Sequence, residues 1–262
     1  MTRHTLRRSG RVLALASMAA LAACSVTEDL LQVENPTELP ISELQQTALI
    51  NALINGVVGD FTHMYDDPFI WQGSMFTDEQ VTGINWEQTA RLNLRIVQFN
   101  EGPTDAMFSQ ISRALRQGED VSERFRTLLT SPNSDARLAK TLAFAGYSYI
   151  AMGEAMCEAV VSRVDINTGV VIFGDKLLTP SELFTTALGH FAEAITIATA
   201  AGDNTMLNLA RVGTARAALN LGGQAAAVIA AASAVPANFR YELEYSATTP
   251  REQNTLYARV TG

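Results

Sequence analysis

The stretch 61–88 carries the side-chain types that proteins use to bind sugars. It holds both tryptophans of the chain, a tyrosine and two adjacent carboxylates, namely Trp71, Trp86, Tyr65, Asp66 and Asp67. Aromatic rings stack on the C–H faces of sugar rings, while carboxylates and amides bind the hydroxyl groups. The apolar periodicity is weaker here than in the flanking segments, as is typical of a binding loop. These residues are therefore the candidate ligand contacts. The alternative is that the two tryptophans pack helices against the core.

The histidines do not have the spacing of a catalytic or metal site. His63 lies close in sequence to Asp60 and Asp66, which allows either a carboxylate–histidine site or a solvated acidic loop, and we favour the loop. His190 falls in the middle of a helical pattern, where a partly exposed residue is expected. The chain has no G-x-S-x-G, no phosphate-binding glycine loop and no H-E-x-x-H. We therefore expect no enzyme activity, no metal ion and no cofactor.

The N-terminus predicts a lipid anchor on Cys24. A basic region without acidic residues comes first, made by Arg3, Arg7, Arg8 and Arg11. The apolar stretch 12–21 is shorter than the roughly 20 residues that span a bilayer and has the size of a signal-peptide core. The letters L-A-A-C at 21–24 then form a lipobox, in which small residues fit a protease cleft and the thiol accepts a diacylglyceryl group. The alternative is an ordinary cleavage site with an incidental cysteine.

The lipobox predicts the domain organisation and the compartment. We expect a lipoprotein signal peptide over 1–23, a lipidated extended tether over 24–41 and a folded domain over 42–262. Acyl chains on the mature N-terminus would attach the protein to a membrane, since more than one chain is needed for stable anchoring. Ser25 after the cysteine is consistent with sorting to the outer membrane. We therefore expect an outer-membrane lipoprotein, held by lipid and displayed at the cell surface.

The charge and cysteine content restrict the partners. The net charge of the full chain is −8, and removal of the arginine-rich leader makes the mature protein more negative still. An acidic surface argues against nucleic acid and against anionic lipid head groups, but not against neutral glycans or peptides. Only Cys157 remains besides the lipidated cysteine, so no internal disulfide is possible, and we expect Cys157 to be a small buried apolar residue.

The remaining patterns predict an all-α domain with one excursion. Apolar residues at helical spacing predict helices over 42–58, 61–76 (interrupted at Pro68), 85–99, 104–129, 134–158, 179–202, 204–221 and 224–234. The letters T-P-S-E at 179–182 form a capping box with proline at the first helical position. Residues 160–178 contain valine pairs around Asn167-Thr168-Gly169 and predict a hairpin or loop insertion. The tail 239–245 alternates as an extended segment does.

Helix pairs with small residues at their crossings predict a tetratricopeptide-like helical repeat. The best unit is 215–236, in which a first helix ends in L-N-L-G, an alanine follows at 227 and Pro236 closes the second helix. A second unit can be drawn from 149–153 and 187–198, with the excursion inserted between its helices. The alternative is an irregular helical bundle with an alanine-rich core.

The order of these features resembles the SusD/RagB family of nutrient-binding outer-membrane lipoproteins. The letters L-L-Q-V-E-N-P at 30–36 are similar to the "L-x-V-x-N-P" opening of many members. The segments that look like the family's repeat helices and its following strand are 139–154, 179–201, 208–236 and 239–243. Members of the family usually run longer after the last repeat, so the end at Gly262 predicts a truncated or minimal variant.

The resemblance implies a SusD-like fold and a role in uptake. A member would bind an oligosaccharide or another nutrient and deliver it to a TonB-dependent transporter of the SusC/RagA type, on which it sits as a lid. The alternative from another class is a periplasmic tetratricopeptide lipoprotein that scaffolds envelope assembly and binds no small ligand. A lipid-anchored hydrolase would need an acid/base pair that the sequence does not contain.

Overall fold

The computed structural model describes residues 41, 43–83, 85–99, 101–249 and 251–261. The predicted signal peptide 1–23, Cys24 and the predicted tether 24–41 lie outside the described residues, except for Ile41, which is in a turn.

The described chain is mostly helical, as predicted for the fold class. Short 3-10 turns at Glu43–Gln45, Thr47–Leu49 and Pro132–Ser134 accompany the longer helices. These are α2 (Ile50–Met64), α3 (Trp71–Phe76), α4 (Glu87–Asn93), α5 (Gly102–Leu128), α6 (Ala136–Ala155), α7 (Pro180–Ala201), α8 (Asn204–Leu221), α9 (Ala225–Ser233) and α10 (Thr255–Thr261). Within the described residues, no helix is both long enough and apolar enough to cross a membrane.

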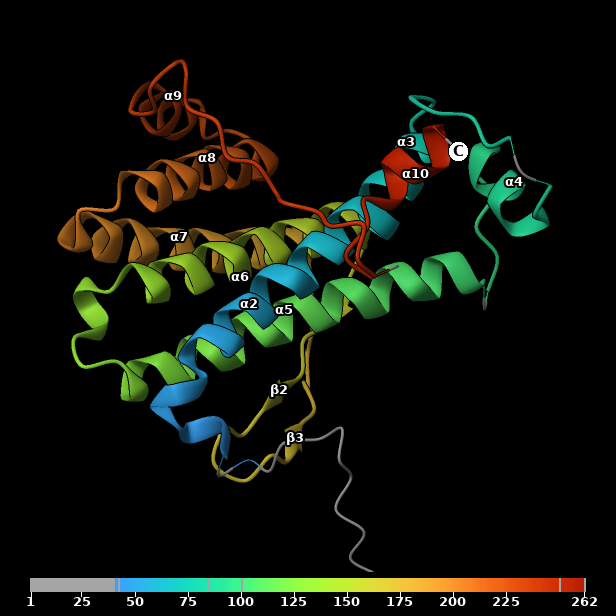
Figure 1. The fold of residues 1–262 in the computed structure, drawn as a ribbon. Coiled ribbons are helices and arrows are strands. Elements are labelled where there is room, and N and C mark those ends of the chain that lie inside the picture. Colours follow the sequence, from blue (N-terminus) through green and yellow to red (C-terminus); the bar gives the residue numbers. More distant parts are fainter. Residues whose placement is uncertain (1–40, 42, 84, 100, 250, 262) are drawn as a thin grey trace, which may run out of the picture. The chain divides into compact units, whose positions relative to one another are not determined.

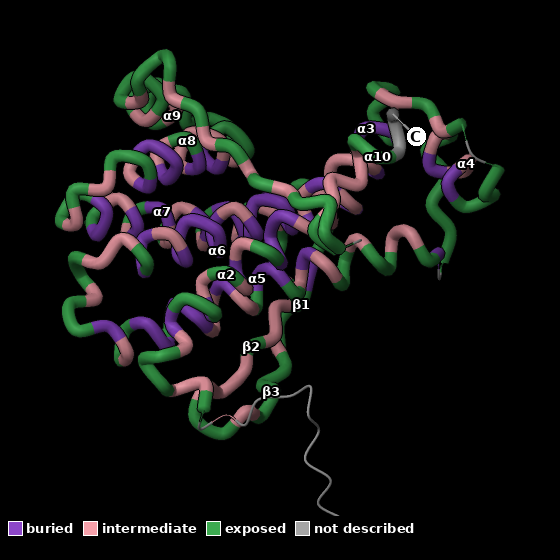
Figure 2. Tube along the Cα trace, in the orientation of Figure 1, coloured by how far each residue is buried: buried purple, intermediate pink, exposed green. Residues whose placement is uncertain are grey.

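The long helices lie side by side in the order of the chain. Helix α2 packs on α5, α5 on α6, α6 on α7, α7 on α8, and α8 on α9 (Figure 1). Helix α6 is at the centre of this array and is buried on most of its circumference, as the purple segments in Figure 2 show. A helix that is apolar and small all round belongs in a core. Each of its neighbours buries only one stripe and exposes the other.

Glycines on α6 and α8 receive phenylalanine rings from α7. A Cβ built on Gly146 would lie 2.8 Å from the ring of Phe191, and one on Gly153 would lie 2.7 Å from the ring of Phe184. Gly213 of α8 meets the other side of Phe191, where a Cβ would approach to 2.3 Å. The two phenylalanines are two helical turns apart on α7, and the two glycines are two helical turns apart on α6. The antiparallel helices therefore bring both Phe–Gly pairs into contact at once. Close packing of α6, α7 and α8 therefore requires the absence of side chains at these glycines.

The ends of α6, α7 and α8 follow standard capping chemistry. The predicted capping box at the start of α7 is confirmed: Thr179 accepts a hydrogen bond from the Glu182 N–H, and the Glu182 carboxylate accepts one from the Thr179 N–H. Gly202 ends α7 in the left-handed conformation, at φ 69°. Asp135 and Asp203 accept hydrogen bonds from backbone N–H groups at the starts of α6 and α8.

Several predicted boundaries are wrong. The helix predicted over 85–99 is only Glu87–Asn93, because the apolar residues that follow are exposed and have no core to cover. Helix α5 begins at Gly102 with Glu101 as its N-cap, before the predicted start at Thr104. Gly118 lies within α5 against Ala145 of α6, where an added Cβ would be 3.0 Å from the alanine. Position 118 therefore needs glycine for a close helix contact.

The helix predicted over 61–76 is interrupted at Pro68 as expected, and the interruption is a π-helical segment. Residues Tyr65–Ile70 form a π-helical segment between α2 and α3, with non-helical angles at Asp67 (φ −141°, ψ 110°). Proline cannot donate a hydrogen bond and excludes the regular helix before it, so the chain shifts its register here.

Residues 159–178 leave the helical array as two short antiparallel ladders. Strand β2 (Arg163–Val164) pairs with β3 (Val171–Ile172), and β1 (Ala159–Val160) pairs with β4 (Leu177–Leu178). Arg124 of α5 and Gln45 both donate to the Ile166 carbonyl, at 3.1 Å and 3.0 Å. These bonds fasten the tip of the excursion to the helices.

The tail after α9 is extended and returns along the array. Phe239, Tyr241, Leu243 and Tyr245 are partly buried, whereas the residues between them are exposed, so the predicted alternation is confirmed. No strand partner is assigned to this segment within the described chain. The tail leads to α10, which contacts the π-helical segment. No sequence pattern predicted α10.

The prediction for Cys157 is wrong. The residue is exposed, because α6 ends at Ala155 and the chain turns away from the core before Cys157. Its side chain is a free thiol.

The glycine contacts predict opposite effects for two Gly→Ala substitutions. Gly213→Ala should lower the free energy of unfolding by about 1–3 kcal/mol, because the new methyl overlaps the buried Phe191 ring. Gly59→Ala, in the middle of α2, should raise it by about 0.5–1 kcal/mol, because a Cβ there meets nothing within 4 Å and alanine favours helix. Urea unfolding of the two variants checks this. Equal effects of the two substitutions would contradict the proposed close packing.

Candidate functional site

A large hollow in the described chain lies between α2, α5 and the start of the excursion. This polar cavity has a volume of about 910 Å³, within the usual range for small-molecule sites. Its lining residues are Asn55, Gly56, Gly59, Asp60, Phe108, Ser109, Ser112, Arg113, Leu115, Arg116, Gln117, Met152, Val160, Val161, Ser162 and Arg251. One wall is therefore a polar stripe of α2, the opposite wall is a polar stripe of α5, and the floor is apolar.

Among the described residues that line the cavity, Asp60 is the only carboxylate. It is 8% exposed and binds two arginines: Arg113 Nε lies 3.3 Å from its carboxylate, and the Arg251 guanidinium contacts the other oxygen. A buried carboxylate costs free energy unless positive groups compensate it, and two guanidinium groups do so here. The contact between Asp60 and Arg251 also connects α2 to the segment just before α10, which lies far along the chain.

Arg116 is the cation of the cavity without a direct partner. It is exposed and forms no hydrogen bond or ion pair with the residues that the structure describes, although Asp120 one turn further along α5 attracts it electrostatically. Ser112 on the same helix has a buried hydroxyl oxygen that likewise lacks a hydrogen-bond partner in the described chain. The cavity thus presents unused hydrogen-bonding capacity.

Asp120 lies beside the cavity in a partly buried position. Burial raises the pKa of Asp120 to about 6, against the opposing effects of a hydrogen bond from the Val164 backbone and of the charges on Arg116 and Arg124. The carboxylate is therefore ionised at neutral pH but at a cost in stability.

A second hollow, the aromatic cavity, lies between α2, α6, α8 and the extended tail. It has a volume of about 390 Å³ and is lined by Phe61, Tyr65, Phe144, Tyr147, Leu209, Val212, Arg216, Phe239, Arg240, Tyr241 and Leu243. The rings form a continuous set: Phe61 stacks on Tyr65 with centroids 5.5 Å apart and meets Phe144 edge-on at 4.8 Å. Arg216 is held by Glu154, with Nε and Oε1 2.9 Å apart.

The residues predicted as ligand contacts are not brought together. Tyr65 lines the aromatic cavity. Trp86 is 62% exposed at the start of α4 and lines a separate hollow of about 550 Å³. Trp71 is partly buried at the start of α3. None of these side chains belongs to the polar cavity.

The two predicted carboxylates lie in the π-helical segment. Asp66 is 4% exposed, and its carboxylate accepts a hydrogen bond from the Thr255 N–H at the start of α10. Burial raises the pKa of Asp66, although that hydrogen bond favours the charged form. Asp67 next to it is partly buried. The solvated acidic loop expected around His63 is wrong, because Asp60 and Asp66 are buried and hold the C-terminal segment in place.

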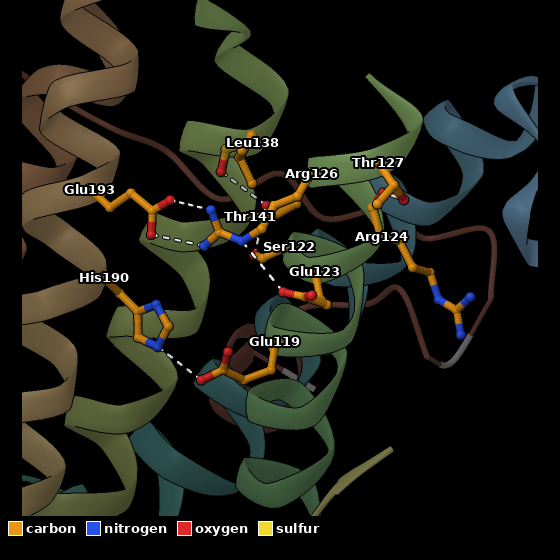
Figure 3. Close-up of polar contacts among 10 residues, drawn as sticks. All are labelled: Glu119, Ser122, Glu123, Arg124, Arg126, Thr127, Leu138, Thr141, His190 and Glu193. Carbon is orange, nitrogen blue, oxygen red and sulfur yellow. Dashed lines mark hydrogen bonds and ion pairs between the residues drawn. The ribbon is translucent and has the colours of Figure 1, made fainter. Parts of the chain in front are cut away.

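Polar contacts between α5, α6 and α7 stabilise the array (Figure 3). Arg126 binds both oxygens of Glu193, with Nη2 2.9 Å from Oε2, and Glu123 lies 3.5 Å from Arg126 Nε. Ser122 donates to Thr141 over 2.9 Å between two buried helices. These contacts join α5 to α6 and α7 and have the geometry of helix-to-helix ties.

His190 takes part in the same set of contacts. Its Nε2 lies 2.8 Å from the Glu119 carboxylate, and its ring stacks on Tyr149 with centroids 5.4 Å apart (Figure 3). Burial opposes the ionisation of Glu119, but the hydrogen bonds to His190 and Tyr149 and the charges of His190 and Arg126 together outweigh it, so the pKa of Glu119 lies below its usual range. His190 is partly exposed on α7, as its pattern predicted. No cluster of three or more metal-ligating side chains occurs in the described part of the chain.

Sequence reasoning missed the polar cavity. Its residues on α5 recur at helical spacing, at 109, 112, 113, 116 and 117, and those on α2 do so at 55, 56, 59 and 60. A polar stripe on an amphipathic helix ordinarily faces solvent. The signal that two such stripes face each other lies in the packing of α2 on α5 and not in either stripe.

Comparison of the chain with protein-family models, with curated proteins and with solved structures found no match in any of the three. The candidate site therefore rests on its own geometry.

The position of Asp120 predicts the pH dependence of stability. Because its folded pKa lies near 6, above the ordinary value of 3.8, the folded state binds this proton more tightly than the unfolded chain does. The free energy of unfolding should therefore rise as the pH falls from 7 to 5. Asp120→Asn should be more stable than the wild type at pH 7, by on the order of 1 kcal/mol after allowance for solvent screening. Its free energy of unfolding should change much less between pH 7 and pH 5 than that of the wild type.

Chemical unfolding of the purified full chain at several pH values measures this effect. Asp105→Asn is the matched control, since Asp105 is exposed on the same helix. If Asp120→Asn and Asp105→Asn show the same pH profile, the assignment to Asp120 is wrong.

Proposed function

We propose that this chain is a lipid-anchored outer-membrane protein of the SusD/RagB type, which binds a nutrient and delivers it to a TonB-dependent transporter. The observation that carries the proposal is the polar cavity, a hollow of about 910 Å³ on a rigid pair of helices. The lipobox at Cys24 supports the anchor, and the family resemblance supports the uptake role.

The helical array supports the tetratricopeptide-like part of the proposal. Helices α5 to α9 pack consecutively, and α6 also contacts α8, as stacked helix pairs do. The Phe–Gly contacts make α6, α7 and α8 a rigid unit. Such a unit suits a protein that presents a fixed surface to a partner while holding a ligand at one side.

The cavities support a nutrient ligand with hydroxyl groups. Asn55, Gln117 and the serines of the polar cavity are hydrogen-bonding groups for hydroxyls. The aromatic cavity adds the rings of Tyr65, Tyr147 and Tyr241, which suit the C–H face of a sugar. Trp71, Trp86, Asp66 and Asp67 remain predicted contacts on sequence grounds alone.

Exposed apolar side chains between α3 and the first turns of α5 support contact with another protein. They are Phe76, Val81, Trp86, Leu94, Ile96, Val97, Phe99 and Phe108, of which Phe99 is 93% exposed. Clustered exposed apolar residues mark interaction surfaces. The transporter is the partner we propose. The same residues favour the second candidate function, a periplasmic scaffold for envelope assembly, which would use this surface without a small ligand.

Affinity purification from mildly solubilised membranes tests the function. The wild-type chain should recover a TonB-dependent barrel, and protease added to intact cells should cleave the chain. Cys24→Ala is the control, because the variant lacks the thiol for lipid attachment and should be absent from the outer membrane. Recovery of assembly machinery together with protection from protease would contradict the uptake proposal and favour the scaffold.

A further inference from the structure

The charge of the polar cavity is opposite to that of the protein. The formal net charge of the chain is −8, yet the charged lining residues are three arginines, Arg113, Arg116 and Arg251, and one carboxylate, Asp60. The arginines therefore exceed the carboxylates in a hollow with an apolar floor. The positive electrostatic potential of the arginines is strengthened inside a hollow with apolar walls, even though the net charge of the whole protein is negative. The arrangement places positive charge where a ligand would lie.

Asp60 does not neutralise this charge. Its two oxygens are occupied by Arg113 and Arg251, which leaves one positive charge on that cluster and a second on Arg116. Asp120 attracts Arg116 but is not among the lining residues, and no hydrogen bond joins the two in the described chain. The Arg116 guanidinium thus keeps its donors available to a ligand. Guanidinium groups match carboxylates and phosphates with paired hydrogen bonds.

The other walls narrow the class of anion. Asn55 of α2 provides an amide on the wall that faces Arg113 and Arg116, and Gln117 and Ser109 add an amide and a hydroxyl on the same helix as these arginines. Ser112 contributes a hydroxyl oxygen that has no partner in the described chain. The apolar floor includes the buried side chains of Leu115 and Met152. An inorganic anion would contact only the arginines. A hydroxylated organic acid would bind the arginines with its carboxylate, the amide and hydroxyl side chains with its hydroxyl groups, and the apolar residues with its carbon skeleton.

We propose that the polar cavity binds a hydroxylated organic acid, such as a uronic acid, whose carboxylate is held by Arg116 together with the Arg113–Asp60–Arg251 cluster. This inference names the ligand class of the cavity and rests on the proposed function as a nutrient-binding protein. Asp60 acts as a positioning residue, because it orders two of the arginines and does not itself contact the anion.

Calorimetric titration of the purified full chain with glucuronate and gluconate tests the inference, with glucose as the uncharged probe and inorganic phosphate as the simple anion. We expect at least one of the two organic acids to bind at least tenfold more tightly than glucose and phosphate. Arg116→Gln should weaken that binding at least tenfold. The fold should persist, since Arg116 is exposed and has no direct partner in the described chain.

Arg95→Gln is the matched control, because it removes the same charge from an exposed site that does not line the cavity, and its affinity should equal that of the wild type. Unfolding curves of both variants verify that they are folded. The proposal is overturned if neither acid binds, if glucose binds as well as the acids, or if Arg116→Gln and Arg95→Gln bind equally.

The membrane purification separates this inference from the proposed function. Recovery of the transporter by a chain that binds neither acid refutes only the ligand class. Binding of an acid by a chain that recovers no transporter refutes only the delivery role.

Discussion

The fold depends on the contact between the Phe191 ring and two glycines. The ring is fully buried and lies between Gly146 of α6 and Gly213 of α8, where no Cβ can be accommodated without displacement. Dispersion contacts of this kind are weak singly but numerous at close approach, and they fall off steeply if the helices separate. Because α6 also carries Gly153 against α7 and Ala145 against α5, the same helix sets the spacing of its neighbours on both sides.

The polar cavity is assembled from several parts of the chain that are distant in sequence. Helices α2 and α5 supply the walls, the start of the excursion supplies Ser162, and the segment before α10 supplies Arg251. Asp60 joins the first and last of these through its two arginine contacts. Asp66, one turn and a half further along, holds the N-terminus of α10. Two buried carboxylates, Asp60 and Asp66, therefore hold the C-terminal segment in place, and Asp60 also orders two arginines of the polar cavity.

The chain separates two kinds of surface that an uptake protein needs. Exposed apolar residues gather around α4, whereas the polar cavity lies along the facing stripes of α2 and α5, and the two surfaces share only Phe108 among the residues named here. A protein that binds a partner and a small ligand at once benefits from keeping the two apart, since neither contact then displaces the other. The proposed function assigns the first surface to the transporter and the second to the nutrient.

The sequence by itself determined the local structure that depends on near neighbours: the helical class, the capping box at Thr179 and the alternation of the tail. Capping bonds and apolar periodicity span a few residues, so their physical causes are present in a short stretch of letters. Only the tertiary structure decided that Gly118 is a contact position, that Asp60 and Asp66 are buried, and that polar stripes of α2 and α5 enclose a hollow. Each of these depends on which helix lies opposite, and a stripe facing water has the same spacing as one facing another stripe.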